Sequence, residues 1–510
     1  MAEIPRFRFV PVNLRLLMLV PVSLAAIPAG ATVPVGMFEQ SQDIGGPAIE
    51  GNAHYDEAEQ AYTLSGAGKN MWFGRDEFHF AWKQVEGDFI LRATIRFVGE
   101  GVDPHRKIGV MVRESLEADS AYADACVHGD GLTSLQYRTE TGADTEEVGM
   151  EIGALPTEIQ MERRGDVFIF SAATPGAEYR SVRKEMGLPA EVYTGLFICS
   201  HREDVMEQAV FSNVRLVKPA PADLVPYRDY LGSNLEVMEV VTGKRKILHS
   251  ENRSLQAPNW TPDNKFLIYN ADGLLYRYAL QDGSITVLNT GFADHNNNDH
   301  VLSFDGEQLG ISHHVGDECT SVIYTLPVAG SDKPRQITDP AKGHSFLHGW
   351  SPDAGKLIFT GQRDGQFDIW SVDLESGKET QLTDLPTLDD GSEYSPDGKW
   401  IYFNSVRTGT MQLWRMRPDG SEPEQLTFDD RNNWFPHLSP DGKWLVYISF
   451  PEDIDPSDHP FYKQVYLKLM PAEGGASRVI AYLYGGQGTI NVPSWSPDGS
   501  KIAFVSNTGM

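Results

Sequence analysis

One short phrase recurs through the second half of the chain and constrains the fold more than any other feature. It has the form Ser-Pro-Asp-Gly, with small variations, and it begins at Thr261, Ser303, Ser351, Ser395, Ser439 and Ser496. Successive phrases lie 42, 48, 44, 44 and 57 residues apart. A period in the forties, with strand-like runs filling each interval, is typical of β-propeller blades. We therefore expect six blades.

The repeat unit also indicates how the ring closes. Within residues 394–427 the pattern predicts a turn at 395–398, strands at 400–405 and 411–416, and an outer strand at 424–427. After the last phrase only part of a blade remains. Segment 234–248 matches segment 368–382 in register, including a glycine turn and a terminal leucine. We expect this early segment to complete the final blade, so that the ring is closed by its own termini.

These repeats resemble the WD40-like (PD40) propeller repeats of the TolB family, which share the Ser-Pro-Asp-Gly-Lys turn and the Gln-Leu-Thr blade end. The loop Arg407–Gly409 also matches the Arg-x-Gly loop of that family. The resemblance implies a six-bladed propeller over residues 228–510. TolB itself carries an N-terminal α/β domain and works with a peptidoglycan-associated lipoprotein, and nothing before residue 228 has that α/β pattern. Such propellers also serve as peptidase gates and polysaccharide lyases, so the fold does not fix the function.

The first half of the chain alternates rather than repeats. In residues 88–97 the apolar positions fall on one face, as in a half-buried strand, and helical periodicity is nearly absent. We expect an all-β chain, with a two-sheet β-sandwich over residues 32–218 and a proline-rich linker at 219–227. The sandwich resembles the concanavalin-A-like jelly rolls that accompany carbohydrate-active enzymes, through phrases at 87–89, 107–113, 193–196 and 211–214.

Four large side chains of this half, Trp72, His79, Trp82 and Tyr122, have two interpretations. Aromatic faces suit the apolar faces of pyranose rings, so they could form a sugar-stacking surface. Burial in the sandwich is the commoner fate of large aromatic side chains, and we favour it.

The N-terminus indicates export. Three arginines, an apolar run at 16–27 and small residues at 29–31 predict a signal peptide over residues 1–31, with a short membrane anchor as the alternative. The run is too short to span a bilayer. We expect a periplasmic or secreted protein that is not an integral membrane protein after cleavage.

Charge and cysteine content narrow the partners. Lys and Arg number 43 against 71 Asp and Glu, a net charge of −28, which repels phosphate backbones and argues against nucleic acid as a partner. Cys126 and Cys199 could pair in an oxidising compartment, or all three cysteines, including Cys319, could be buried and unpaired. No Cys-x-x-Cys spacing suggests a structural zinc site.

Candidate site residues lie just before the turns, because the innermost strand of each propeller blade lines the central channel. His300 and His348 share an offset on adjacent blades, so we expect them to point the same way and name them as candidate catalytic residues. Together with His437 and Glu393 they could bind one divalent metal, Mn²⁺, Ca²⁺ or Zn²⁺. Candidate ligand-binding residues nearby are Asp299, Asp389, Asp390, Asn433, Trp434, Gln487 and Asn491. The other interpretation is that these groups hydrogen-bond blade to blade.

Two functions from different classes follow. The first is an exported binding protein whose sandwich and propeller engage a glycan or an envelope protein. The second is a metal-dependent carbohydrate-active enzyme with its site at the propeller mouth, either a glycoside hydrolase or a lyase resembling oligogalacturonate lyases, in which a histidine removes the α-proton of a metal-bound uronate. The chain has no Gly-x-Ser-x-Gly nucleophile elbow, which excludes a prolyl-peptidase-type hydrolase. Because no catalytic signature matches, we favour binding.

Overall fold

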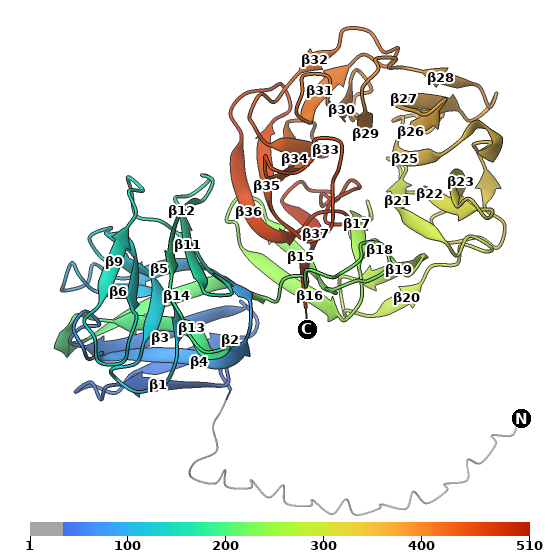
Figure 1. Ribbon diagram of the computed structural model, residues 1–510. Helices are drawn as coiled ribbons and strands as arrows, with labels where there is room; N and C mark the ends of the chain where they lie inside the picture. The colour runs from blue at the N-terminus through green and yellow to red at the C-terminus, as the bar shows by residue number, and fades with distance from the viewer. Residues whose placement is uncertain (1–33, 510) are drawn as a thin grey trace, which may run out of the picture.

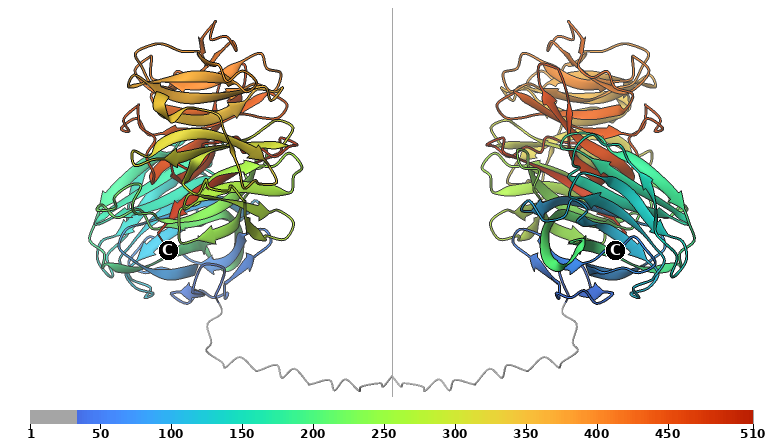
Figure 2. Two further views of the ribbon diagram at one scale, coloured as in Figure 1. Left: turned by 90° about the vertical axis from the view of Figure 1, so that its right-hand side faces the viewer. Right: turned by 90° about the vertical axis from the view of Figure 1, so that its left-hand side faces the viewer.

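The computed structural model describes residues 34–509, which form two all-β domains side by side (Figures 1 and 2). The predicted signal peptide, residues 1–31, lies outside the described residues. The N-terminal domain is a sandwich of two sheets and the C-terminal domain is a ring of six sheets. The fold class predicted from the sequence is therefore confirmed.

Two seven-stranded antiparallel sheets form the sandwich. The first sheet has, in spatial order, β1 (Gln40–Ile44), β4 (Phe78–Glu86), β13 (Glu191–Cys199), β6 (Lys107–Arg113), β7 (Tyr122–His128), β8 (Thr133–Arg138) and β9 (Glu146–Gly149). The second has β12 (Arg180–Glu185), β11 (Val167–Ala173), β10 (Glu158–Arg164), β5 (Phe89–Val98), β14 (Arg202–Val217), β3 (Ala61–Gly68) and β2 (Asn52–Asp56).

The sandwich core lies between these two sheets. On β5 the alternate residues Phe89, Leu91, Ala93 and Ile95 are all buried in it, as the alternation predicted. A second apolar cluster, which includes Phe78, covers the other face of the first sheet. The first sheet is thus buried on both faces.

Six sheets make the propeller blades. The closing blade holds β15 (Gly232–Glu239), β16 (Arg245–Glu251) and β37 (Lys501–Thr508). The other five are β17 (Gln256–Trp260), β18 (Phe266–Ala271), β19 (Leu274–Ala279) and β20 (Ile285–Val287); β21 (Asn296–Leu302), β22 (Gln308–Val315), β23 (Thr320–Pro327) and β24 (Arg335–Gln336); β25 (Ser345–Trp350), β26 (Lys356–Arg363), β27 (Gln366–Asp373) and β28 (Glu379–Gln381); β29 (Asp389–Tyr394), β30 (Ile401–Ser405), β31 (Gln412–Met416) and β32 (Glu424–Gln425); and β33 (Asn432–Leu438), β34 (Trp444–Phe450), β35 (Lys463–Pro471) and β36 (Arg478–Gly485). The single-turn 3₁₀ helix η1 (Pro340–Lys342) precedes β25.

The ring closes by pairing the two ends of the domain. β15 pairs antiparallel with β37 from Gly232 opposite Thr508 to Glu239 opposite Lys501. Trp495 bridges Ile502 and takes the innermost place in this blade. The early segment therefore completes the last blade, as predicted, and two edges that would otherwise be open are paired.

The repeated turn phrases share one set of contacts. In the turn at 395–398, Ser395 Oγ donates to Asp397 Oδ1 at 2.8 Å, and the same oxygen accepts the backbone N–H of Lys399 at 3.1 Å. Equivalent Ser–Asp or Thr–Asp bonds of 2.6 to 2.8 Å recur in the other five turns. Hydrogen bonds from Lys399 and Ser395 lower the pKa of Asp397 to about 2. These aspartates stabilise turns.

A buried ion cluster joins the domains at the closing blade. Glu236 of β15 is fully buried and accepts from Arg215 of β14 at 2.6 Å, from Arg245 at 2.7 Å and from Ser506 of β37 at 2.6 Å. Burial raises the pKa of Glu236, but the two guanidiniums outweigh it and lower the pKa to about 2. One carboxylate thus ties the sandwich to both ends of the propeller.

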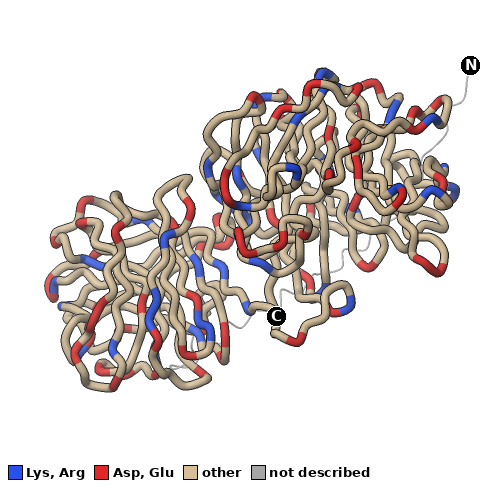
Figure 3. Tube along the Cα trace, turned by 45° about the horizontal axis from the view of Figure 1, so that its top comes forward, with Lys and Arg blue, Asp and Glu red and all other residues tan. Residues whose placement is uncertain are grey.

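Acidic residues are spread over the loops of both domains (Figure 3). Within residues 34–509, no helix has the length and apolar character needed to cross a membrane.

Candidate functional site

A cavity of about 560 Å³ opens at one end of the propeller channel, where the inner strands begin. We call this end the loop-side mouth. Its walls come from inner strands, from the loops at 451–462 and 486–491, and from the segment before the first blade. The lining residues are Tyr227, Asn297, Asn298, Asp299, His314, Phe346, His348, Thr360, Phe367, Leu388, Asp390, Phe435, Ser457, His459, Gln487 and Asn491.

A histidine–carboxylate pair lies in this mouth. His348 Nε2 is 2.9 Å from Asp390 Oδ1, and His348 is only 6% exposed. Burial lowers the pKa of His348, but the charge and hydrogen bond of Asp390 outweigh it and raise the pKa. Burial raises the pKa of Asp390, but His348 outweighs it and the pKa falls to about 2. The pair therefore favours the imidazolium–carboxylate form.

The Asp390 carboxylate is fixed by its own neighbours. Thr360 Oγ1 donates to Oδ1 at 2.5 Å, and the backbone N–H of Gly391 donates to the same oxygen at 2.7 Å. His459 Nε2 lies 4.0 Å from Oδ2. A carboxylate held in this way orients the His348 ring toward the cavity.

Asp299 is the second carboxyl group of the mouth, and its surroundings differ. It is 6% exposed, and no group among the described residues hydrogen-bonds its carboxylate. Burial raises its pKa to about 7, although His348 partly opposes this. Asp299 is therefore largely protonated below neutral pH and can donate a hydrogen bond.

Replacing Asp299 with asparagine is expected to change how stability depends on pH. Because the folded-state pKa of Asp299 is raised, the folded chain binds more protons than the unfolded chain between about pH 4 and 7, and stability falls as pH rises through this range. Asparagine does not titrate, so Asp299→Asn should melt above the wild type at pH 8 and close to it at pH 5.

Thermal unfolding followed by circular dichroism at both pH values checks this expectation. Asp364→Asn, in an exposed turn, is the control. An identical difference between variant and wild type at pH 5 and pH 8 would contradict the raised pKa.

An aromatic wall completes the mouth, and the sequence analysis missed it. The Phe435 ring centroid lies 6.0 Å from that of His348 and 5.3 Å from that of His459, and His459 packs edge-on against Trp434 at 4.5 Å. Phe435 has a φ of 54° and lies in a bulge of β33. One signal was available, because the 57-residue interval before the last phrase contains the loop that carries His459.

The structure separates His300 from His348, although both stand three residues before the serine of their turn. His300 pairs with Ile311 as a regular residue of β21, and its Nε2 lies 3.2 Å from the carbonyl oxygen of Ile268. His348 is the extra residue of a bulge in β25 and faces the cavity. Burial lowers the pKa of His300 to about 4. The expectation that the two point the same way was wrong, and His300 is structural.

The other members of the predicted metal set lie toward the opposite end of the channel. Glu393 lines a second cavity of about 330 Å³ beside the turns, and it accepts from His437 Nδ1 at 2.8 Å and from the backbone N–H of Leu438 at 3.1 Å. His437 Nε2 contacts the carbonyl oxygen of Ile490 at 2.7 Å. His300, His348, His437 and Glu393 therefore do not converge on one point, which corrects the predicted set.

Three predicted ligand-binding residues have structural partners instead. Asp389 forms a buried ion pair with Arg407 at 2.9 Å. Asn433 donates to Asp429 at 2.9 Å, and Trp434 is fully buried in an apolar cluster. These contacts match the blade-to-blade interpretation.

Gln487 and Asn491 do line the mouth. Asn491 Nδ2 donates to Gln487 Oε1 at 2.7 Å, and Asn491 Oδ1 accepts the backbone N–H of Gly488 at 2.8 Å. The structure thus brings together five predicted residues, which are Asp299, His348, Asp390, Gln487 and Asn491.

The sandwich residues singled out from the sequence are mostly buried. His79, Trp82 and Tyr122 are buried, and Trp72 is partly exposed. Cys126 and Cys199 are buried and unpaired, while Cys319 is exposed, so the expectation of three buried thiols holds for two of them.

Comparisons with known proteins identify the propeller half. A family profile described as "TolB beta propeller domain" matches residues 318–455. An uncharacterized protein, Atu1656, from Agrobacterium fabrum is 46% identical over 274 residues, which are 54% of this chain and 92% of that protein. A solved TolB-like structure from Agrobacterium tumefaciens is 44% identical with a TM-score of 0.53, covering 55% of this chain and all of that one.

A more distant structure, TolB from Acinetobacter baumannii, is 16% identical with a TM-score of 0.39. It covers 64% of this chain and 79% of that chain. At this level the similarity carries no argument about function.

Proposed function

This chain belongs to the TolB-like β-propeller family, and from that premise we propose that it is an exported binding protein whose loop-side mouth holds its ligand. One observation carries the proposal. A fixed histidine–carboxylate pair, a second carboxyl group with a raised pKa and an aromatic wall all converge on a cavity of about 560 Å³. A mostly apolar hollow with a few convergent polar groups is the usual form of a binding site.

The chemistry of the mouth suits an uncharged or weakly charged ligand rich in hydroxyl or amide groups. Gln487, Asn491 and Asn298 offer amide donors and acceptors, while Phe346 and Phe367 offer apolar faces. A glycan or a peptide segment of an envelope protein has such groups. The net charge of −28 makes a polyanionic glycan a poorer fit. An export signal over residues 1–31 would place the protein in the periplasm or outside the cell.

A second candidate, a carbohydrate-active enzyme, has one observation in its favour. The mouth holds two carboxyl groups with opposite pKa displacements, Asp299 at about 7 and Asp390 at about 2, as acid–base pairs do. The metal-dependent form fits less well, because among residues 34–509 the group of side chains placed to share a metal ion lies in the sandwich.

Calorimetric titration tests the proposal. The probes are a trigalacturonate, a neutral β-glucan oligosaccharide, soluble peptidoglycan fragments and a peptide library, and the variant is His348→Gln. We expect one probe class to bind the wild type and to lose at least about tenfold in affinity in the variant. Val287→Ala, on an outer strand, is the control and should bind like the wild type.

The same samples distinguish the two candidate functions. Chromatography after long incubation should recover a bound oligosaccharide intact if the protein only binds. Shortened or unsaturated products that disappear in Asp299→Asn would instead support the enzyme. Binding that is unchanged in His348→Gln would place the site elsewhere.

A further inference from the structure

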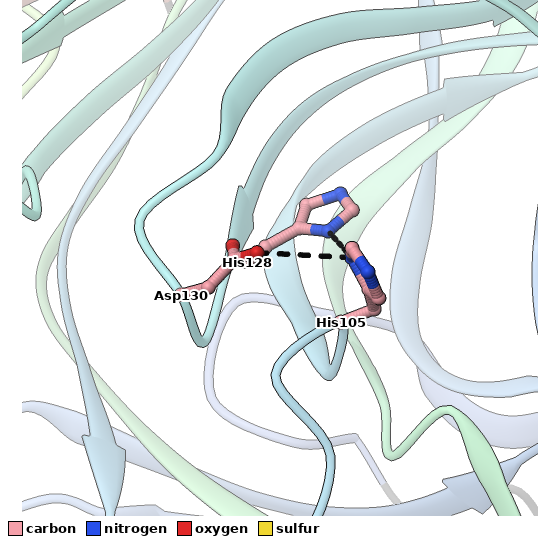
Figure 4. Close-up of side chains that lie close together, drawn as sticks. All are labelled: His105, His128 and Asp130. Carbon is pink, nitrogen blue, oxygen red and sulfur yellow. Dashed lines mark hydrogen bonds and ion pairs between the residues drawn. The ribbon is translucent and has the colours of Figure 1, made fainter.

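We propose that the sandwich domain binds one divalent transition-metal ion, with zinc as the type case, through His105, His128 and Asp130 (Figure 4). His105 Nδ1 lies 3.4 Å from His128 Nδ1 and 3.9 Å from Asp130 Oδ2. Tetrahedral ligands at about 2.0–2.1 Å from zinc lie about 3.3–3.4 Å from one another. The three atoms therefore stand close to the corners of one coordination polyhedron.

The backbone holds the two loops of this site together. The N–H of Gly129 donates to the carbonyl oxygen of Arg106, and the N–H of Asp130 donates to that of Pro104, both at 2.9 Å. Arg106 also forms a buried ion pair with Glu207 at 2.7 Å, which anchors the loop that carries His105. Because the ligands are already positioned, binding an ion requires little further ordering.

The donor set selects the class of metal. Imidazole nitrogens suit zinc, copper, nickel and iron, whereas calcium and magnesium prefer oxygen ligands throughout. Burial and the charge of Lys107 lower the pKa of His128 to about 3, so this imidazole is neutral at physiological pH. Lys107 repels a cation, while Asp130 and Asp103 attract one.

The surroundings supply both an outer shell and an open side. Gln136 Nε2 lies 3.2 Å from His128 Nε2, and the amide can turn so that its oxygen accepts the Nε2–H while Nδ1 binds metal. Asp103 accepts the backbone N–H of His105 at 2.8 Å and lies 3.3 Å from His201 Nδ1. The side chains of His105 and Asp130 are 50% and 39% exposed, which leaves a fourth position for water.

Binding also moves a proton. In the metal-free form one proton lies between the Nδ1 atoms of His105 and His128, and a metal ion displaces it to solvent. Affinity should therefore fall as pH is lowered.

The test uses full-length mature protein without an affinity tag, stripped with a chelator. Zinc is titrated by calorimetry and cobalt by visible absorption. We expect one equivalent of zinc per chain and a cobalt spectrum typical of tetrahedral coordination. His105→Ala should weaken zinc binding by about tenfold or more, because it removes one of three ligands. His105 is half exposed, so this change does not disturb the core.

Two further variants complete the design. Asp130→Asn should also weaken binding. His295→Ala removes an exposed propeller histidine that lies 2.7 Å from Asp294, and it should bind zinc like the wild type. A wild type that binds no zinc, or zinc binding that is unchanged in both His105→Ala and Asp130→Asn, would overturn the proposal.

Discussion

Replacing Glu236 with alanine is expected to lower the free energy of unfolding by about 3–5 kcal/mol, because breaking a buried ion pair leaves uncompensated charge. Arg215 and Arg245 would both remain buried without their carboxylate, and Ser506 would lose its acceptor. The loss falls where β15 meets β37, so ring closure and the domain interface should weaken together. Urea unfolding of the full chain measures it.

The same variant should change the acid limb of stability. The folded-state pKa of Glu236, about 2, lies below its ordinary value of 4.5. Its contribution is therefore fully present above about pH 4.5 and is lost as pH falls toward 2. In Glu236→Ala this part of the pH dependence should be missing.

A surface ion pair provides the control for Glu236. Lys69 and Glu203 lie 2.8 Å apart with both side chains more than half exposed. Glu203→Ala should leave stability nearly unchanged, because solvent screens such pairs. Equal losses in the two variants would contradict the role assigned to the buried cluster.

Replacing Asp390 with asparagine is expected to lower the pKa of His348 by about one to three pH units, because an opposite charge within hydrogen-bond distance has this effect. Asparagine can still accept from Thr360 and Gly391, so the geometry is retained while the charge is removed. Burial, which lowers the pKa of His348, then acts unopposed by Asp390. NMR titration of the His348 ring protons measures the change.

Asp294→Asn is the matched control for this titration. It removes the carboxylate beside His295, which lies outside the mouth, and it should not alter His348. An unchanged His348 pKa in Asp390→Asn would show that the pair does not set the charge of the mouth. A ligand that requires the imidazolium should bind the wild type less well as pH rises through the His348 pKa.

The blades and their closure were predictable because they depend on repeated local chemistry. Each turn needs a Ser–Asp hydrogen bond and a residue that tolerates the turn conformation, and these constraints leave a phrase in the sequence. The pairing of β15 with β37 followed from the same repeat, since a segment lacking its own turn phrase matched the outer part of another blade.

The site was harder to predict because inner strands carry bulges at different places. Counting back from the turn put His300 and His348 in register, yet in β21 the irregularity lies between Asn296 and His300, whereas in β25 it falls at His348 itself. A one-residue shift reverses the direction of a side chain. His459 was missed for another reason, because its loop carries no repeat phrase and its partner Asp390 is distant in sequence.

Site-specific photo-crosslinking tests the central claim, that the loop-side mouth is the binding site, most directly. A benzophenone amino acid is placed at Phe346, which lines the mouth, and at Val287, which is exposed on an outer strand, and cells exporting each variant are irradiated. The account predicts a discrete adduct at Phe346, weakened by Asp390→Asn, and none at Val287. Adducts of equal yield at both positions, or at Val287 alone, would contradict it.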